Sequence, residues 1–323
     1  MHQIIASDLL NWSIRLVAFL FGAIWGSFFN VAIFRWPRGL SVVTPASRCP
    51  ACDEPIPWYL NLPIFGFFLL RGRAACCGAK ISRRYVLVEI IGALLSVAVV
   101  ERYLINASPS TRLTDAVVLS LLYFAFVGGL VIITFIDMEF MEIPDEVSLP
   151  LAALGLVTAS FRANPGAEAA ALGAGGSYLI VQLLFVWAYE RLTGRRGMGE
   201  GDAKLLMMIG AFLGWQGALF SLMAGAFQGI VVVAVGLILG RSVTADELRD
   251  NGETGPGEKR YNASAEQSES KYPDVGSREN AGEPQPRYIG HLKIPFGPFL
   301  ALSALEFLFF GQWLLDCYFG LFY

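Results

Sequence analysis

Two aspartates at the ends of apolar stretches are the residues in this chain best suited to do chemistry. Asp137 ends one stretch, and Asp202 follows Gly199 and Gly201 at the start of another, 65 positions later. A carboxylate at membrane depth is costly unless it is paired or solvated, so it marks a candidate functional site. Two carboxylates held together can share one proton, so that one activates water while the other protonates a leaving group. The pair predicts aspartyl hydrolysis at a membrane. Gly199 and Gly201 permit a close approach of the backbone and unusual φ angles beside Asp202.

Composition places these aspartates in a membrane protein. Hydrophobic residues make up 55% of 323 residues, charged residues make up 16%, and the mean hydropathy is +0.53. These values are far from those of a soluble domain. We expect an all-α polytopic membrane fold with about eight transmembrane helices. The apolar runs that predict them lie at residues 16–33, 86–100, 116–136, 148–161, 169–187, 205–213, 218–239 and 296–315.

The placement of basic residues predicts the orientation. From Arg35 to Arg84 there are eight basic residues against two acidic ones, and the connection at 191–204 is also basic. Basic connections lie in the cytoplasm by the positive-inside rule. Eight spans then place both termini outside and bring Asp137 and Asp202 to the cytoplasmic edge, where they can face one another.

The chain divides into five predicted segments. Residues 241–290 are rich in Gly, Pro, Ser, Glu and Asn and lack apolar periodicity, a composition typical of disorder. The segments are a first span (1–34), a cytoplasmic cysteine-containing insert (35–85), a transmembrane protease core (86–240), a disordered cytoplasmic loop (241–290) and a final span (291–323).

The insert carries a candidate metal site. Cys49 and Cys52 are separated by two residues, and Cys76 and Cys77 follow about 25 positions later. Two close cysteine pairs favour a structural zinc site, which would supply folding energy that this small polar insert lacks. Reduced free thiols and a disulfide are the alternatives, and the cytoplasm disfavours the disulfide.

Other charged residues near the aspartates have simpler interpretations. Asp145 follows a proline, so we expect it to open the next helix and to cap it, with a catalytic role as the alternative. We expect Glu139 and Glu142 to be solvated. Lys204 either holds Asp202 ionised or extends to the lipid headgroups, as long basic side chains do.

Ordered motif blocks run along nearly the whole chain. They lie at 26–37 (GSFFNVAIFRWP), 47–52 (SRCPAC), 56–63 (IPWYLNLP), 71–73 (RGR), 81–85 (ISRRY, with Glu89 following), 136–145 (IDMEFMEIPD), 199–204 (GEGDAK) and 294–300 (IPFGPFL). Together they resemble the bacterial type IV prepilin peptidases, the bifunctional leader peptidase/N-methyltransferases of pilus and type II secretion systems.

The resemblance implies an intramembrane aspartyl protease of the GxGD type, with Asp137 and Asp202 as the catalytic residues. Related peptidases have Asn where Asp145 stands, which agrees with a capping role. The implied substrates are prepilins or pseudopilins with a short basic leader, cut after a glycine. The implied second activity methylates the new N-terminus with S-adenosylmethionine and involves the insert. The implied location is the bacterial inner membrane, with the active site at the cytoplasmic face and no nucleic-acid partner.

Two departures from the family pattern bear on function. Ala74 stands where the family has the first cysteine of its second pair, and Cys76 stands beside Cys77 instead. A peptidase without methyl transfer is therefore the alternative function. The 241–290 loop is also longer than the family pattern leads us to expect. A proton-coupled transporter and a noncatalytic scaffold are competing classes, but neither explains the cysteine insert together with the ordered blocks.

Overall fold

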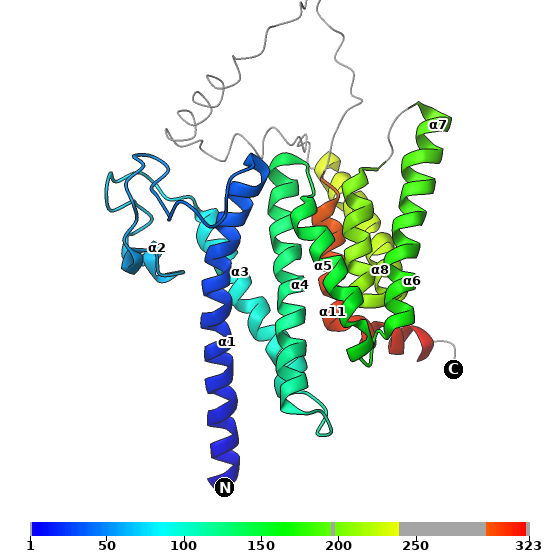
Figure 1. Cartoon of the computed structure of the whole chain (residues 1–323), viewed down its shortest axis with the longest axis horizontal. Helices are drawn as coiled ribbons and strands as arrows, with labels where there is room; N and C mark the ends of the chain where they lie inside the picture. The colour runs from blue at the N-terminus through cyan, green and yellow to red at the C-terminus, as the bar shows by residue number, and fades with distance from the viewer. Residues whose placement is uncertain (1, 195–197, 239–294, 321–323) are drawn as a thin grey trace, which may run out of the picture.

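The structure is a computed structural model that describes residues 2–194, 198–238 and 295–320. Within these residues every regular element is a helix (Figure 1), as the apolar runs predict. The longer helices are α1 (His2–Arg35), α3 (Arg83–Val100), α4 (Leu113–Phe140), α5 (Asp145–Thr158), α6 (Ala167–Ile180), α8 (Glu200–Ile238) and α11 (Gly297–Gly320). The short elements are η1 (Trp36–Arg38), η2 (Trp58–Leu60), α2 (Phe65–Leu69), η3 (Glu101–Ile105), η4 (Ala159–Phe161), η5 (Val181–Ala188) and α7 (Tyr189–Thr193). The predicted disordered loop, 241–290, lies outside the described residues.

Several helices are suited to a bilayer. Four described stretches are long and apolar enough to cross a membrane, namely Asp8–Arg38, Leu113–Phe140, Ala167–Thr193 and Glu200–Gly236, and Gly297–Gly311 is a shorter apolar helix. Where the chain is described, the residues of the eight predicted apolar runs are helical, except for Phe296, which directly precedes α11; the helices themselves extend beyond most of the runs. The protein is therefore an all-helical membrane protein, and the count of eight spans stays a prediction.

Helix α8 reverses direction at Gly214, which has non-helical dihedral angles (φ 73°, ψ −178°). Its 39 residues would otherwise extend about 58 Å, nearly twice the hydrocarbon thickness of a bilayer. After the break, Gly217 packs against Phe307, ten residues into α11, whereas Gly225 packs against Leu300 near the start of α11. The second half of α8 therefore runs antiparallel to α11, back toward the end of the bundle that holds the aspartates. This reversal is why the sixth and seventh apolar runs are separate in the sequence.

Helix α1 packs against α3 through small residues. An added Cβ at Gly22 would lie 2.4 Å from the carbonyl oxygen of Gly92, and one at Gly26 would lie 2.7 Å from the Cα of Glu89. Such close backbone approach is the usual basis of helix association in membranes, where lipid tails are as apolar as leucine.

Helix α4 lies in the middle of the bundle (Figure 1). On one side Phe29 of α1 packs against Gly128. On the other side Phe126 stacks on Phe212 of α8, with ring centroids 4.4 Å apart. Both phenylalanines of the stacked pair are fully buried. This packing holds the end of α4, which carries Asp137, beside the start of α8, which carries Asp202.

Candidate active site and metal centre

The end of α4 positions Asp137. Met141 adopts the left-handed conformation (φ 54°) and donates its N–H to the carbonyl oxygen of Asp137 (2.9 Å), which closes the last turn. Pro144 prevents the helix from continuing and becomes the N-cap of α5. Asp137 is only 5% exposed and Asp202, in the first turn of α8, is 9% exposed. Both candidate catalytic residues therefore lie at helix ends, buried from bulk water.

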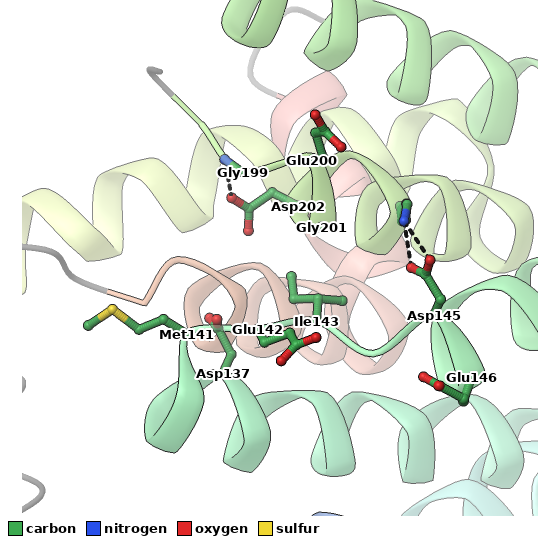
Figure 2. A pocket seen from close by; sticks show the side chains of 11 residues that line it. Asp137, Met141, Glu142, Ile143, Asp145, Glu146, Gly199, Glu200, Gly201 and Asp202 are labelled. Carbon is green, nitrogen blue, oxygen red and sulfur yellow. Dashed lines mark hydrogen bonds and ion pairs between the residues drawn. The ribbon is translucent and has the colours of Figure 1, made fainter. Parts of the chain in front are cut away.

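Backbone amides hold one oxygen of each carboxylate. The N–H of Gly297, at the start of α11, donates to Asp137 Oδ2 (2.8 Å), and the N–H of Gly199 donates to Asp202 Oδ2 (3.2 Å). Neither Oδ1 receives a hydrogen bond from the described residues. Figure 2 shows the two side chains pointing toward one another, and their charges interact. The arrangement leaves one oxygen of each carboxylate for a water molecule or a substrate.

Both aspartates line a single cavity of about 420 Å³. Six of its lining residues are acidic, and the one basic residue is a lysine. The lining residues are Asp137, Met141, Glu142, Ile143, Asp145, Glu146, Gly199, Glu200, Gly201, Asp202 and Lys204. The cavity is therefore strongly electronegative and favours positively charged groups near the aspartates.

Glycines are needed at two positions around this cavity. An added Cβ at Gly201 would lie 2.9 Å from the Cβ of Ile143, and one at Gly297 would lie 2.7 Å from Asp137 Oδ2. The predicted close approach at Gly201 is confirmed. The predicted unusual φ is wrong, because the positive-φ glycines of the described residues do not include Gly199 or Gly201.

Asp145 forms an ion pair that was not predicted from the sequence. It is the first residue of α5, as expected, but Pro144 is the N-cap and no side chain caps this helix. The Asp145 carboxylate instead accepts hydrogen bonds from Lys204 Nζ at 2.6 and 2.7 Å. The capping role was therefore wrong, and Lys204 pairs with Asp145 instead of Asp202. The extension of Lys204 toward the lipid headgroups stays a prediction. The pair ties the start of α5 to the start of α8 and forms one wall of the cavity (Figure 2).

Glu139 also differs from its prediction. It forms an ion pair with Arg84, at the start of α3, and lies 3.9 Å from the guanidinium of Arg38. The prediction of a solvated Glu139 was wrong, whereas Glu142 is exposed as expected. The ion pair connects the end of the insert to the helical turn that carries Asp137.

The Gly297 amide was not predicted from the sequence as a partner of Asp137. The 294–300 block was predicted only as part of the family resemblance, without a role in the site. A glycine between two prolines, Pro295 and Pro298, at the start of an apolar run was the available signal. The partner itself lies 160 positions from Asp137, so no local pattern could identify it.

The four predicted cysteines of the insert come together. Their Sγ atoms all lie within 4.8 Å of one another, with Cys49–Cys77 at 3.7 Å and Cys52–Cys76 at 3.2 Å. All four are free thiols in the structure, which contradicts the disulfide alternative. A tetrahedral zinc ion with Zn–S bonds of about 2.3 Å separates its sulfurs by about 3.8 Å. The four thiols therefore fit a zinc ion, although Cys76 and Cys77 are adjacent.

Two short turns present these thiols. Arg48 and Pro55 form one isolated bridge, and Arg73 and Lys80 form the other. Burial opposes ionisation of the Cys49 thiol, but hydrogen bonds from the backbone N–H groups of Ala51 and Cys52 lower its pKa to about 7. The hydrogen bond with Cys52 raises the pKa of the Cys76 thiol, so Cys49 ionises before Cys76. A lowered pKa favours the thiolate, which is the form that binds metal.

Comparison with known proteins identifies the class. Residues 20–103 match the Bacterial Peptidase A24 N-terminal domain, and residues 124–234 match the Type IV leader peptidase family. A prepilin leader peptidase/N-methyltransferase of Aeromonas hydrophila is 37% identical over 261 residues, which covers 72% of this chain and 84% of the relative. That of Klebsiella pneumoniae is 41% identical over 61% of this chain and 84% of the relative, and that of Myxococcus xanthus is 32% identical over 92% and 90%. The chain belongs to this family of bacterial prepilin leader peptidase/N-methyltransferases. No solved structure matches the chain.

Proposed function

We propose that this chain is a membrane aspartyl endopeptidase that removes the leader of type IV prepilin-like proteins and methylates the new N-terminus. One observation carries the proposal. Two buried carboxylates from different helices, Asp137 and Asp202, line one cavity. The family match supplies the kind of reaction and the substrate class.

The two aspartates divide the chemistry between them. When they share one proton, the ionised carboxylate takes a proton from water as the water oxygen attacks the scissile carbonyl carbon. The protonated partner gives its proton to the amide nitrogen, which leaves as the carbon–nitrogen bond breaks. The N–H groups of Gly297 and Gly199 fix one oxygen of each carboxylate, so both reacting oxygens are oriented before the substrate arrives.

The charge of the cavity supports a basic leader as the substrate. Besides the two aspartates it is lined by Glu142, Asp145, Glu146 and Glu200, and its lysine is paired with Asp145. A negative cavity attracts basic segments and repels acidic ones. We infer that the basic residues of a leader bind along this rim while the scissile bond reaches the aspartates.

Methyl transfer needs a donor, for which S-adenosylmethionine is the proposed co-substrate, and we assign no residue to its binding. We also propose that Cys49, Cys52, Cys76 and Cys77 hold one structural zinc ion, because their four sulfur atoms converge. The ion would supply folding energy to two short turns that have little apolar core.

We propose the bacterial inner membrane as the location, with the active site at the cytoplasmic face. Figure 1 shows the insert, the α4–α5 connection and the start of α8 at one end of the bundle, with the N-terminus at the other. This end carries the basic residues of the insert, which the positive-inside rule places in the cytoplasm.

One experiment tests both activities. Purified protein in vesicles is mixed with a prepilin and S-adenosylmethionine, the leader is followed by gel shift, and the N-terminus is followed by mass spectrometry. We expect a shortened pilin whose N-terminus carries one added methyl group. A shortened but unmethylated pilin would support the peptidase alone, which is the alternative that Ala74 and the adjacent Cys76 and Cys77 raise. An uncut prepilin would refute the proposal.

A further inference from the structure

Part of the insert has large apolar side chains that are exposed among the described residues of the chain. The segment of residues 57–70, which contains η2 and α2, has Trp58 80% exposed, Phe68 64% exposed and Leu69 72% exposed. Tyr59, Leu62 and Phe65 are exposed as well. Exposed apolar side chains gathered in one segment mark an interaction site.

The position of this segment identifies what it contacts. The N–H of Ile64 donates to Glu89 Oε2 (2.7 Å). Glu89 lies six residues into α3, about 9 Å along the axis from its basic start. The Glu89 carboxylate also bonds Ser27 of α1, which lies eight residues, about 12 Å, before the basic end of that helix at Arg35. Ile64 therefore lies beside the interior of α1 and α3 and not beyond their basic ends, and the α1 stretch Asp8–Arg38 is long and apolar enough to cross a membrane.

The local backbone shows that this docking is specific. Ile64 has φ 64° and ψ −55°, a region that a β-branched residue rarely occupies. The hydrogen bond from Ile64 to Glu89 holds the amide in this conformation, and Gly66 packs directly on the carbonyl oxygen of Leu60. In Figure 1, α2 lies below the level at which α1 ends, beside the upper part of α3.

The chemistry of the segment fits a lipid leaflet. Tryptophan and tyrosine favour the boundary between headgroups and acyl chains, and phenylalanine and leucine favour the acyl region next to it. Arg71 and Arg73 follow directly and are exposed, where they can contact the phosphates of anionic lipids.

We propose that residues 57–70 form a monotopic membrane-binding segment that inserts into the same leaflet as the basic ends of α1 and α3. The occupant of its apolar surface is the lipid bilayer. The predicted cytoplasmic insert thus has two parts, a cysteine-bearing part in water and a lipid-embedded part fixed to α3 by Glu89. The embedded part holds the cysteines at the membrane surface.

Photocrosslinking tests this proposal. The full chain is made with p-benzoylphenylalanine in place of Phe68 and reconstituted in vesicles of phosphatidylethanolamine and phosphatidylglycerol. The matched control carries the same group in place of Glu54, which is exposed in the cysteine-bearing part. After irradiation, mass spectrometry should find a lipid adduct on the position-68 protein and none on the position-54 protein.

Other results would overturn the proposal. A crosslink from position 68 to a second copy of the chain would make the patch a protein interface. No lipid adduct at position 68 would place the segment in water. Equal adducts at both positions would refute the division of the insert into a lipid-embedded part and a part in water. Because each variant is checked for wild-type elution on size exclusion, a misfolded position-68 protein is recognised, and the exposed Leu69 then takes the same probe.

Discussion

The hydrogen bond from Gly297 to Asp137 gives a sharp test of the proposed active site. In the variant Gly297→Ala, the new Cβ would lie 2.7 Å from Asp137 Oδ2 and 3.2 Å from Cγ, so the carboxylate must move. The matched control is Gly199→Ala, whose Cβ would lie 3.4 Å from Asp202 Oδ2, an ordinary van der Waals contact. Both variants change one glycine, and both glycines donate an N–H to a candidate catalytic carboxylate.

The size of the effect follows from the interaction that is lost. A hydrogen bond to a charged group contributes about 1.5–3 kcal/mol. Since each 1.36 kcal/mol in the barrier changes the rate tenfold, Gly297→Ala should slow leader cleavage by about 10- to 150-fold. Gly199→Ala should remain within about threefold of the wild type, the range expected of a substitution that removes no named interaction.

The assay is kcat/KM for cleavage of a prepilin by protein in vesicles, with thermal unfolding in detergent as the control for folding. The reasoning is refuted if Gly297→Ala cleaves at the wild-type rate, or if the two variants lose activity equally while both remain folded. In the first case the Asp137 carboxylate does not need the position seen in the structure. In the second case activity responds to any change near the cavity.

Three further predictions concern the aspartates, the cysteines and the orientation. Asp137→Asn and Asp202→Asn should each lower leader cleavage by at least about 100-fold, because each removes an acid–base group. Asp145→Asn should lower it by at most about fivefold, which is the effect of losing a partly exposed ion pair. Clear turnover by a folded Asp137→Asn protein would contradict the catalytic role. The purified wild type should carry close to one zinc ion per chain by elemental analysis. Cys49→Ser should lower the zinc content and the yield of methylated product more than it lowers the rate of cleavage. A metal-free protein with full methylation activity would contradict the proposed zinc site. A cysteine placed in 241–290 should not react with an impermeant reagent added outside intact cells, and efficient labelling there would reverse the proposed topology.

The helices and the candidate catalytic residues could be predicted from the sequence because their signals are local. Apolar runs predict helices wherever a span must satisfy its own backbone hydrogen bonds, and the described helices coincide with those runs. Asp137 and Asp202 could be selected because each carboxylate falls at the end of an apolar run, where a charge is costly unless it is paired or solvated. Close cysteine pairs likewise predicted a cluster that the structure brings together.

Charged pairs show where local reasoning failed. Asp145 was expected to cap a helix and Glu139 to be solvated, because those are the ordinary roles of carboxylates at helix ends. The structure instead pairs Asp145 with Lys204, 59 positions away, and Glu139 with Arg84, 55 positions away. Each basic partner lies on another helix. Which of several basic residues pairs with a given carboxylate therefore depends on which helices pack together.

The sequence by itself determined that this is a helical membrane protein, which side chains could do acid–base chemistry, and which thiols could bind metal, since each follows from the type and spacing of neighbouring residues. Only the tertiary structure decided that α8 turns back at Gly214, that the Gly297 amide holds Asp137, and that Ile64 docks on Glu89 beside the transmembrane helices. The last two of these features are contacts that join residues 160 and 25 positions apart through a backbone N–H group. Because every residue except proline carries the same N–H group, the sequence gives no sign of which of them will be used.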